Sequence, residues 1–202
     1  MNINLYEIRN LDDYFGQRNQ IRAAEKFLEL AKPNKNDKIL EIGSGTGFLY
    51  EYLIFKGYDV IGLEIDFNQV KVKNKKKFII ANALFLPFKN NTFKFIFLND
   101  VVHHIKNIND LLQEIKRVSE NVIMIEPNIL NPYSFLFGFK RDENLRFRNL
   151  KKCLLENKYK INKIDYFLFL PANLLIKLEK FLERTFLKIF GGKKIICART
   201  KK

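Results

Sequence analysis

The stretch Glu41-Ile-Gly43-Ser-Gly45-Thr-Gly47 decides the fold class of this chain. It follows an apolar run at 39–42 and leads into the aromatic and aliphatic residues 48–54, which predicts a strand, a glycine-rich turn and a helix. A second strand at 59–63 is followed by the acid Glu64. Such a turn lets a ligand approach the backbone, the helix offers free N–H groups, and the acid can accept bonds from two ribose hydroxyls. The pattern indicates a site for a nucleoside ligand.

The glycine spacing distinguishes this turn from the dinucleotide-binding type. The dinucleotide fingerprint G-x-G-x-x-G requires glycine at position 48, where this chain has Phe48. The spacing found here, G-x-G-x-G with an acid two residues before it, resembles motif I of the class I S-adenosylmethionine-dependent methyltransferases. The resemblance implies S-adenosylmethionine as the cofactor. It assigns cofactor contacts to Glu41, Gly43, Ser44, Gly45, Gly47, Glu64 and Ile65. A glycine-rich turn without a ligand is the alternative.

Residues 78–88 resemble the third strand of that family and the loop after it. In the family an acid there binds the adenine amino group, and the next backbone amide contacts a ring nitrogen. The resemblance gives these roles to Asn82 and Ala83. Asn82 departs from the family pattern, but its amide oxygen can still accept a hydrogen bond from an amino group.

Residues 91–105 resemble the fourth strand and its exit, and residues 120–128 resemble the fifth strand with its E-P-N exit. The first of these implies a cofactor contact from Asn99. Lys94 replaces an aspartate usual in the family, and the usual glycine pair before the fifth strand is missing, so residues 119–121 must make a tight connection. The details are most similar to the small-molecule branch that includes the quinone-biosynthesis methyltransferases.

Alternating strands and helices predict a single α/β domain over residues 1–202. We expect helices at 17–31, 46–56, about 67–74, 108–118, 145–157 and 172–190, and strands at 38–42, 59–63, 77–81, 93–98, 121–126, 159–170 and 194–199. This order implies a Rossmann-like, mostly parallel seven-stranded sheet with helices on both faces, a three-layer α/β/α sandwich. The family adds the expectation that the last two strands are antiparallel.

The acceptor site must come from segments outside this sheet, because the chain carries no large insertion. We expect a loosely structured arm at 1–16, which with the first helix forms a lid over residues 1–32. Residues 128–148, which contain aromatics at every second position from Tyr133 to Phe139, are the expected acceptor loop. Ordinary packing under the last helices is the alternative for these aromatics.

Composition limits the classes of partner. With 36 basic and 22 acidic residues the net charge is +14, which suits nucleic acid or anionic lipid, although a lysine-rich source composition explains it equally well. The lysine cluster at 71–77 is interpreted as a solvated helix end. Cys153 and Cys197 lack metal-ligand spacing, and we assign no metal site. No signal peptide and no apolar run of about 20 residues is visible, so we expect a cytoplasmic protein without a transmembrane segment.

The two histidines, His103 and His104, are adjacent and lie just past the fourth strand, at the edge where ligands bind in open α/β sheets. We predict His103 as the catalytic residue, a base that serves a hydroxyl acceptor. Hydrogen bonding within a turn is the alternative. The sequence Asn99-Asp100-Val101-Val102 lacks the "[DN]-P-P-[YF]" of methyltransferases that act on exocyclic amines.

The expected function is therefore methyl transfer to an oxygen or carbon of a small molecule. An acceptor attached to a lipid or a sugar is compatible with the amphipathic pattern at 172–190, which otherwise indicates a surface helix, or a peripheral contact with a membrane. RNA methylation, favoured by charge alone, and a non-catalytic binding module that keeps the fold are the alternatives.

Overall fold

The fold is that of the computed structural model, which describes residues 11–72, 76–128, 130–131, 147–167, 181–182 and 184–200. Its strands are β1 (Lys38–Ile42), β2 (Asp59–Glu64), β3 (Phe78–Ile80), β4 (Phe95–Asn99), β5 (Asn121–Pro127), β6 (Tyr159–Phe167) and β7 (Lys193–Thr200). Its α-helices are α1 (Leu11–Ala31), α2 (Phe48–Phe55), α3 (Ile108–Val118) and α5 (Phe147–Glu156), and its 3₁₀ helices are η1 (Phe67–Gln69), η2 (Val102–His104) and η5 (Phe186–Phe190).

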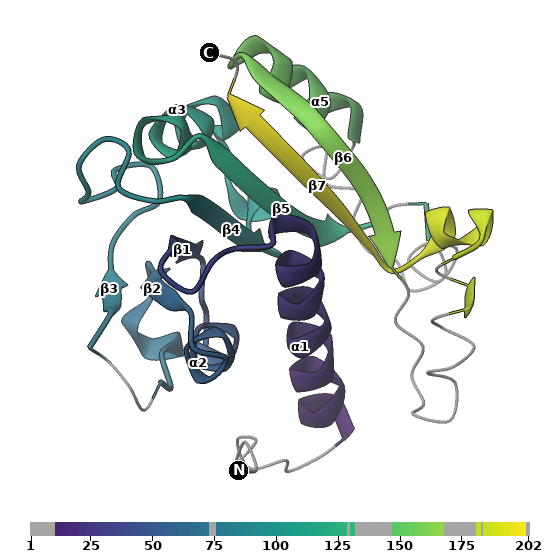
Figure 1. The fold of residues 1–202 in the computed structure, drawn as a ribbon, viewed down its shortest axis with the longest axis horizontal. Coiled ribbons are helices and arrows are strands. Elements are labelled where there is room, and N and C mark those ends of the chain that lie inside the picture. The colour runs from purple at the N-terminus through teal and green to yellow at the C-terminus, as the bar shows by residue number, and fades with distance from the viewer. Residues whose placement is uncertain are drawn as a thin grey trace.

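The seven strands form one sheet in the order β3-β2-β1-β4-β5-β7-β6 (Figure 1). Neighbours from β3 to β5 are parallel, whereas β7 runs antiparallel to both β5 and β6. The prediction of a mostly parallel sheet closed by an antiparallel pair is confirmed. The chain builds outward from β1 through β2 to β3, then crosses to β4 on the other side of β1. In open α/β sheets ligands bind where the strand order reverses in this way, which here is at the carboxyl ends of β1 and β4.

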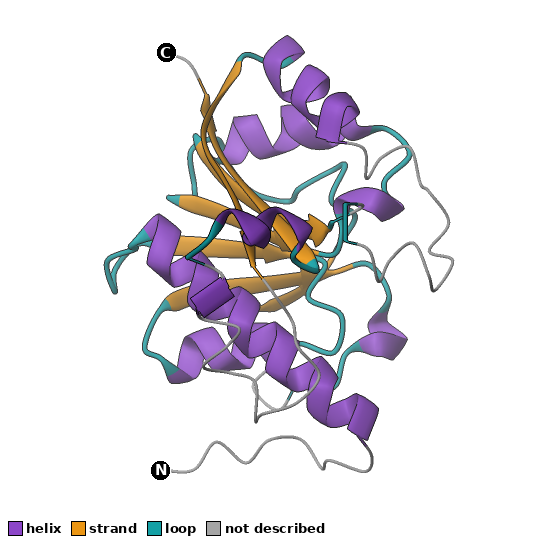
Figure 2. Ribbon diagram, turned by 90° about the vertical axis from the view of Figure 1, so that its right-hand side faces the viewer, coloured by secondary structure: helices purple, strands orange, loops and turns teal. Residues whose placement is uncertain are grey.

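Helices cover both faces of the sheet, which makes three layers (Figure 2). On one face, Phe27 of α1 and Leu53 of α2 are fully buried with the sheet residue Phe97, and the Phe27 and Phe97 rings are stacked with centroids 4.6 Å apart. On the other face, Leu111 of α3 and Leu154 of α5 are buried in a second cluster. Because both faces are covered, the central strands are apolar on both sides.

The predicted start of the first helix is wrong. The helix expected from residue 17 begins at Leu11, so part of the expected arm is helical. Residues 1–10 lie outside the described part of the chain.

The helix expected at about 67–74 is also wrong, because only the short η1 forms. Val70 is extended, and the N–H of Lys71 donates to Thr46 O at 3.1 Å. Val72 is 4% exposed and packs beside Gly47. These contacts hold the segment against the glycine turn, and a continuous helix over residues 67–74 could not make them.

The helix expected at 172–190 does not continue to its predicted end. Thr185 is extended, its Oγ1 accepts a hydrogen bond from Leu187 N at 3.2 Å, and the separate helix η5 starts after it. Residues 168–180, which carry most of the amphipathic pattern, lie outside the described part. Among the described residues, no helix has the length and apolar character that crossing a bilayer requires.

Candidate active site

The glycine turn after β1 has the backbone conformation that its sequence predicts. Gly43, Gly45 and Gly47 have φ angles of 72°, 52° and 82°, a region that residues with a side chain rarely adopt. The N–H groups of Gly43 and Ser44 both donate to Leu63 O, at 2.8 and 3.0 Å. These bonds fasten the turn to the end of β2.

The three glycines face different surroundings. A Cβ on Gly43 would overlap Val101, and one on Gly47 would overlap Val72, so both positions are closed by packing. Among the residues that the structure describes, a Cβ on Gly45 would have only Gln69 Oε1 nearby, at 4.0 Å. Gly45 is therefore the glycine whose missing side chain leaves open space at the carboxyl edge of the sheet.

Glu41 lies below this turn and is 3% exposed. Within the described part of the chain, its Oε2 has no hydrogen-bond partner. Loss of hydration on burial raises the pKa of Glu41 to about 8. A buried acceptor without a protein partner suits a ligand that brings a donor.

Glu64 is 6% exposed and connects the turn to β2. Its Oε2 accepts from Gly45 N at 2.7 Å, while its Oε1 accepts from Ile65 N at 2.8 Å and Asp66 N at 3.1 Å. Oε1 already accepts two hydrogen bonds, whereas Oε2 accepts one and keeps a second lone pair for a ribose hydroxyl. Ile65 is 64% exposed beside it, an apolar surface at the same edge.

The loop after β3 carries Asn82 and Ala83, the two residues that the family resemblance assigns to adenine binding. Asn82 Oδ1 accepts from Leu84 N at 2.9 Å, which closes a tight turn, and Ala83 is buried. A clamp from α3 holds the next part of this loop. Arg117 Nη2 donates to Leu86 O at 2.8 Å, and Glu114 Oε2 accepts from Leu86 N at 2.8 Å.

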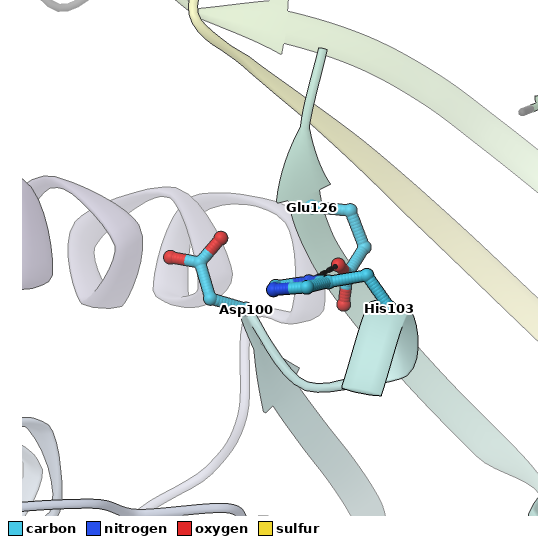
Figure 3. Close-up of side chains that lie close together, drawn as sticks. All are labelled: Asp100, His103 and Glu126. Atoms are coloured by element: carbon cyan, nitrogen blue, oxygen red, sulfur yellow. Dashed lines mark hydrogen bonds and ion pairs between the residues drawn. The ribbon is translucent and has the colours of Figure 1, made fainter. Parts of the chain in front are cut away.

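Strand β4 ends in Asn99, which is partly exposed, and the chain then turns sharply at Asp100, whose φ is 58°. Helix η2 follows and carries both histidines. His103 is half-buried and its ring lies between Asp100 and Glu126, whereas His104 is exposed (Figure 3). The structure therefore brings His103 rather than His104 into the cluster of polar groups at this edge.

Glu126, at the end of β5, joins these groups. Its Oε1 accepts from the N–H groups of Val101 and Val102 at 3.1 and 2.8 Å, and its Oε2 lies 2.7 Å from His103 Nδ1. This hydrogen bond is the main reason why the pKa of His103 is raised, against the opposing effect of burial. Loss of hydration lowers the pKa of Lys194, which pairs with Glu126 across β5 and β7, to about 8.

Asp100 pairs with Lys193 at the start of β7. Polar atoms of Asp100, His103 and Glu126 lie within 4.8 Å of one another, a spacing that no sequence pattern had indicated. Each of the three already has a partner in the protein, so we interpret the cluster as a hydrogen-bonded network.

Sequence reasoning missed the connecting roles of Glu126, Lys193 and the clamp Glu114–Arg117. In the sequence, Glu126 was identified only as the first residue of the E-P-N exit from the fifth strand. The pair on α3 is spaced three residues apart, as in many exposed ion pairs, and nothing in the sequence indicated its loop partner.

The turn fits the proposed cofactor. Gly45 leaves room beside the first turn of α2, and Glu41 provides a buried oxygen that a bound ammonium or hydroxyl can satisfy. Acceptor groups of Glu64 and Asn82 follow along the same edge. These hydrogen-bond acceptors suit a nucleoside with an amino-acid tail.

Comparisons with known proteins agree with this geometry. The family described as Methyltransferase domain matches residues 40–121. An uncharacterized protein of Methanocaldococcus jannaschii is 30% identical over 148 residues, 71% of this chain and 57% of that protein. A ubiquinone/menaquinone biosynthesis C-methyltransferase of Rickettsia prowazekii is 31% identical over 102 residues, 43% of this chain and 41% of that protein. The chain thus spans about half the length of these curated relatives.

Solved structures share the fold across nearly the whole chain. A protein of Pyrococcus horikoshii has a TM-score of 0.67 at 16% identity and covers 98% of this chain and 95% of its own. A SAM-dependent methyltransferase of Archaeoglobus fulgidus has a TM-score of 0.64 at 18% identity, with 90% and 94% covered. The matched methyltransferase domain, the relatives and this fold together support the assignment of the chain to the class I S-adenosylmethionine-dependent methyltransferases, a family that implies S-adenosylmethionine as the cofactor.

Proposed function

We propose that the protein transfers a methyl group from S-adenosylmethionine to an oxygen or carbon of a small-molecule acceptor. The observation that carries this proposal is the open space at Gly45 above Glu41, whose buried Oε2 has no partner among the described residues. A glycine turn without a ligand has no need for either feature.

The proposed cofactor contacts follow the carboxyl edge of the sheet. The turn would receive the amino-acid part, Glu64 and Ile65 the ribose, and the loop after β3 the adenine. The full set is Glu41, Gly43, Ser44, Gly45, Gly47, Glu64, Ile65, Asn82, Ala83 and Asn99.

The bound cofactor supplies an activated methyl group on a sulfonium. The task of the protein is then to align the acceptor and to exclude water, and alignment alone can contribute about 7–11 kcal/mol. His103 would remove the proton of a hydroxyl acceptor, a contribution of about 10²–10⁴-fold. Its place in the network beside β4 supports this role.

The proposed acceptor class is supported by the name of one relative. The Rickettsia relative is named a C-methyltransferase of quinone biosynthesis, which agrees with an aromatic acceptor. Residues 1–32 as a lid and 128–148 as an acceptor loop remain proposals, since residues 1–10, 129 and 132–146 are outside the described part of the chain. A lipid- or sugar-linked acceptor would have to be accommodated there.

Calorimetric titration with S-adenosylmethionine and S-adenosylhomocysteine tests the cofactor site, and we expect micromolar binding. Transfer of labelled methyl to a panel of phenols and quinols then tests the acceptor class. Bulk RNA at low and moderate salt belongs in the same panel, because methylation of RNA that disappears with salt would replace the small-molecule proposal. Folded protein that binds neither cofactor would indicate a binding module instead.

A further inference from the structure

The carboxylate of Glu126 is fixed in a single orientation. It is 3% exposed at the end of β5, and the N–H groups of Val101 and Val102 both donate to its Oε1. These two donors belong to the residue before η2 and to the first residue of η2. Because the backbone holds Oε1 in place, Oε2 must face the ring of His103.

This orientation decides where the imidazole carries its proton. A carboxylate only accepts hydrogen bonds, so the contact of 2.7 Å between Oε2 and Nδ1 requires a proton on Nδ1. In the neutral ring Nε2 is then the unprotonated nitrogen. Figure 3 shows the ring extending from η2 past Glu126 toward the side of Asp100, which directs Nε2 away from Glu126.

We infer that Glu126 is a positioning residue, which holds His103 in the tautomer whose Nε2 accepts a proton from the methyl acceptor. The inference rests on the proposed function and narrows it to acceptors that lose a proton on transfer, such as a phenol or an acidic carbon. In this step the O–H or C–H proton moves to Nε2, the acceptor atom forms a bond to the methyl carbon, and the carbon–sulfur bond breaks with its electron pair on sulfur. A neutral amine, which can attack before it loses a proton, has no need of such a pair.

The other charges around the ring come from three elements. Asp100, at the end of β4, favours the protonated ring, whereas Lys193 of β7 opposes it. His104 of η2 lies against the ring, with centroids 3.9 Å apart, and Lys194 of β7 lies beside Glu126. The hydrogen bond to Glu126 is the largest cause of the raised pKa of His103; burial opposes it, and Asp100 and Lys193 act in opposite directions.

Nitrogen-15 NMR of the two imidazoles tests this inference without any acceptor, because the chain has only His103 and His104. In His104→Gln one pair of imidazole nitrogen signals should disappear, and the remaining pair is thereby assigned to His103. In the wild-type protein, neutral His103 should carry its proton on Nδ1, and its pKa should lie above the ordinary value for a histidine. A His103 ring protonated on Nε2 in the wild-type protein would overturn the inference, whatever the variants do.

Glu126→Gln supplies the second measurement. The amide oxygen would still accept from the two backbone donors, so the NH₂ group would face Nδ1 and force the proton to Nε2. We expect this change of tautomer and a fall in the pKa of His103 by about 1 or more, because the hydrogen bond that raises it is lost. An unchanged pKa in a folded variant would refute the role of Glu126. Selective broadening of His103 by Mn²⁺ would assign the cluster to a metal and also overturn it.

Titration of the same samples with S-adenosylhomocysteine separates the two claims. Cofactor binding with the wrong tautomer refutes only the positioning role. The expected tautomer in a protein that binds no cofactor refutes the proposed function and, with it, the use of this pair in methyl transfer. With an identified acceptor, Glu126→Gln should lower kcat by about 10²–10⁴-fold at unchanged cofactor affinity.

Discussion

Gly45 and Gly57 form a matched pair for testing whether the glycine turn contacts the cofactor. Both have positive φ, 52° and 82°, and within the described part of the chain a Cβ on either would meet no atom closer than 3.8 Å. Gly57 terminates α2, where its N–H donates to Ile54 O at 2.8 Å. It takes no part in the proposed site. Alanine at either position therefore has one cost in the folded protein, the left-handed backbone, of about 1–2 kcal/mol.

This cost predicts how the two variants behave in thermal unfolding. For a chain of this size, about 1 kcal/mol lowers the melting temperature by about 2–4 °C, so each variant should melt about 2–8 °C below the wild-type protein. Gly47→Ala should be much less stable than either, by about 3 kcal/mol, because its Cβ would overlap buried Val72.

Cofactor affinity should then distinguish Gly45 from Gly57. In Gly45→Ala the new methyl group occupies the space proposed for the cofactor, and we expect S-adenosylhomocysteine to bind at least tenfold more weakly, about 1.4 kcal/mol, by calorimetry. Gly57→Ala should bind within twofold of the wild-type protein. Equal affinity in the two variants would show that the ligand does not touch the turn at Gly45, and the reasoning from open space would fail.

Three further changes test other parts of the site. Glu41→Gln removes a group whose pKa rises from 4.5 to about 8 on folding. The ligand-free wild-type protein should therefore lose stability relative to this variant as the pH rises from 4.5 to 8. Melting temperatures of the two proteins that change in parallel over this range would contradict the prediction. Arg117→Met should loosen the loop at 86–88, lower the free energy of unfolding by about 1–2 kcal/mol and weaken cofactor binding severalfold. The control is Arg199→Met, which breaks an exposed ion pair with Glu120 and should leave cofactor affinity unchanged. Asn82→Asp keeps the acceptor for Leu84 N and gains charge, so calorimetry should show tighter binding of S-adenosylmethionine, and weaker binding would remove Asn82 from the adenine site.

Local sequence patterns were sufficient for the sheet and the glycine turn. The run before Gly43, the turn and the acid Glu64 lie within 26 residues, and the conformations of these residues depend mainly on glycine and on alternating apolar residues. All seven strands occur where apolar runs predicted them, and α3 has the predicted bounds. Steric limits on the backbone and burial of apolar faces act at short range along the chain, so the sequence alone determined these elements and the cofactor that they imply.

Tertiary contacts decided the parts that the sequence left open or misassigned. The segment at 67–74 is not a helix because Lys71 donates to Thr46, and the helix expected at 172–190 ends because Thr185 starts a new turn. Pairing of β4 with β5 brings Glu126 to His103, residues 23 positions apart in the chain. No local pattern encodes that contact, since it depends on the register of two strands that a helix separates. The sequence alone thus determined the strands and the glycine turn and predicted which edge of the sheet would bind the cofactor. Only the packed sheet decided which histidine meets a carboxylate at that edge.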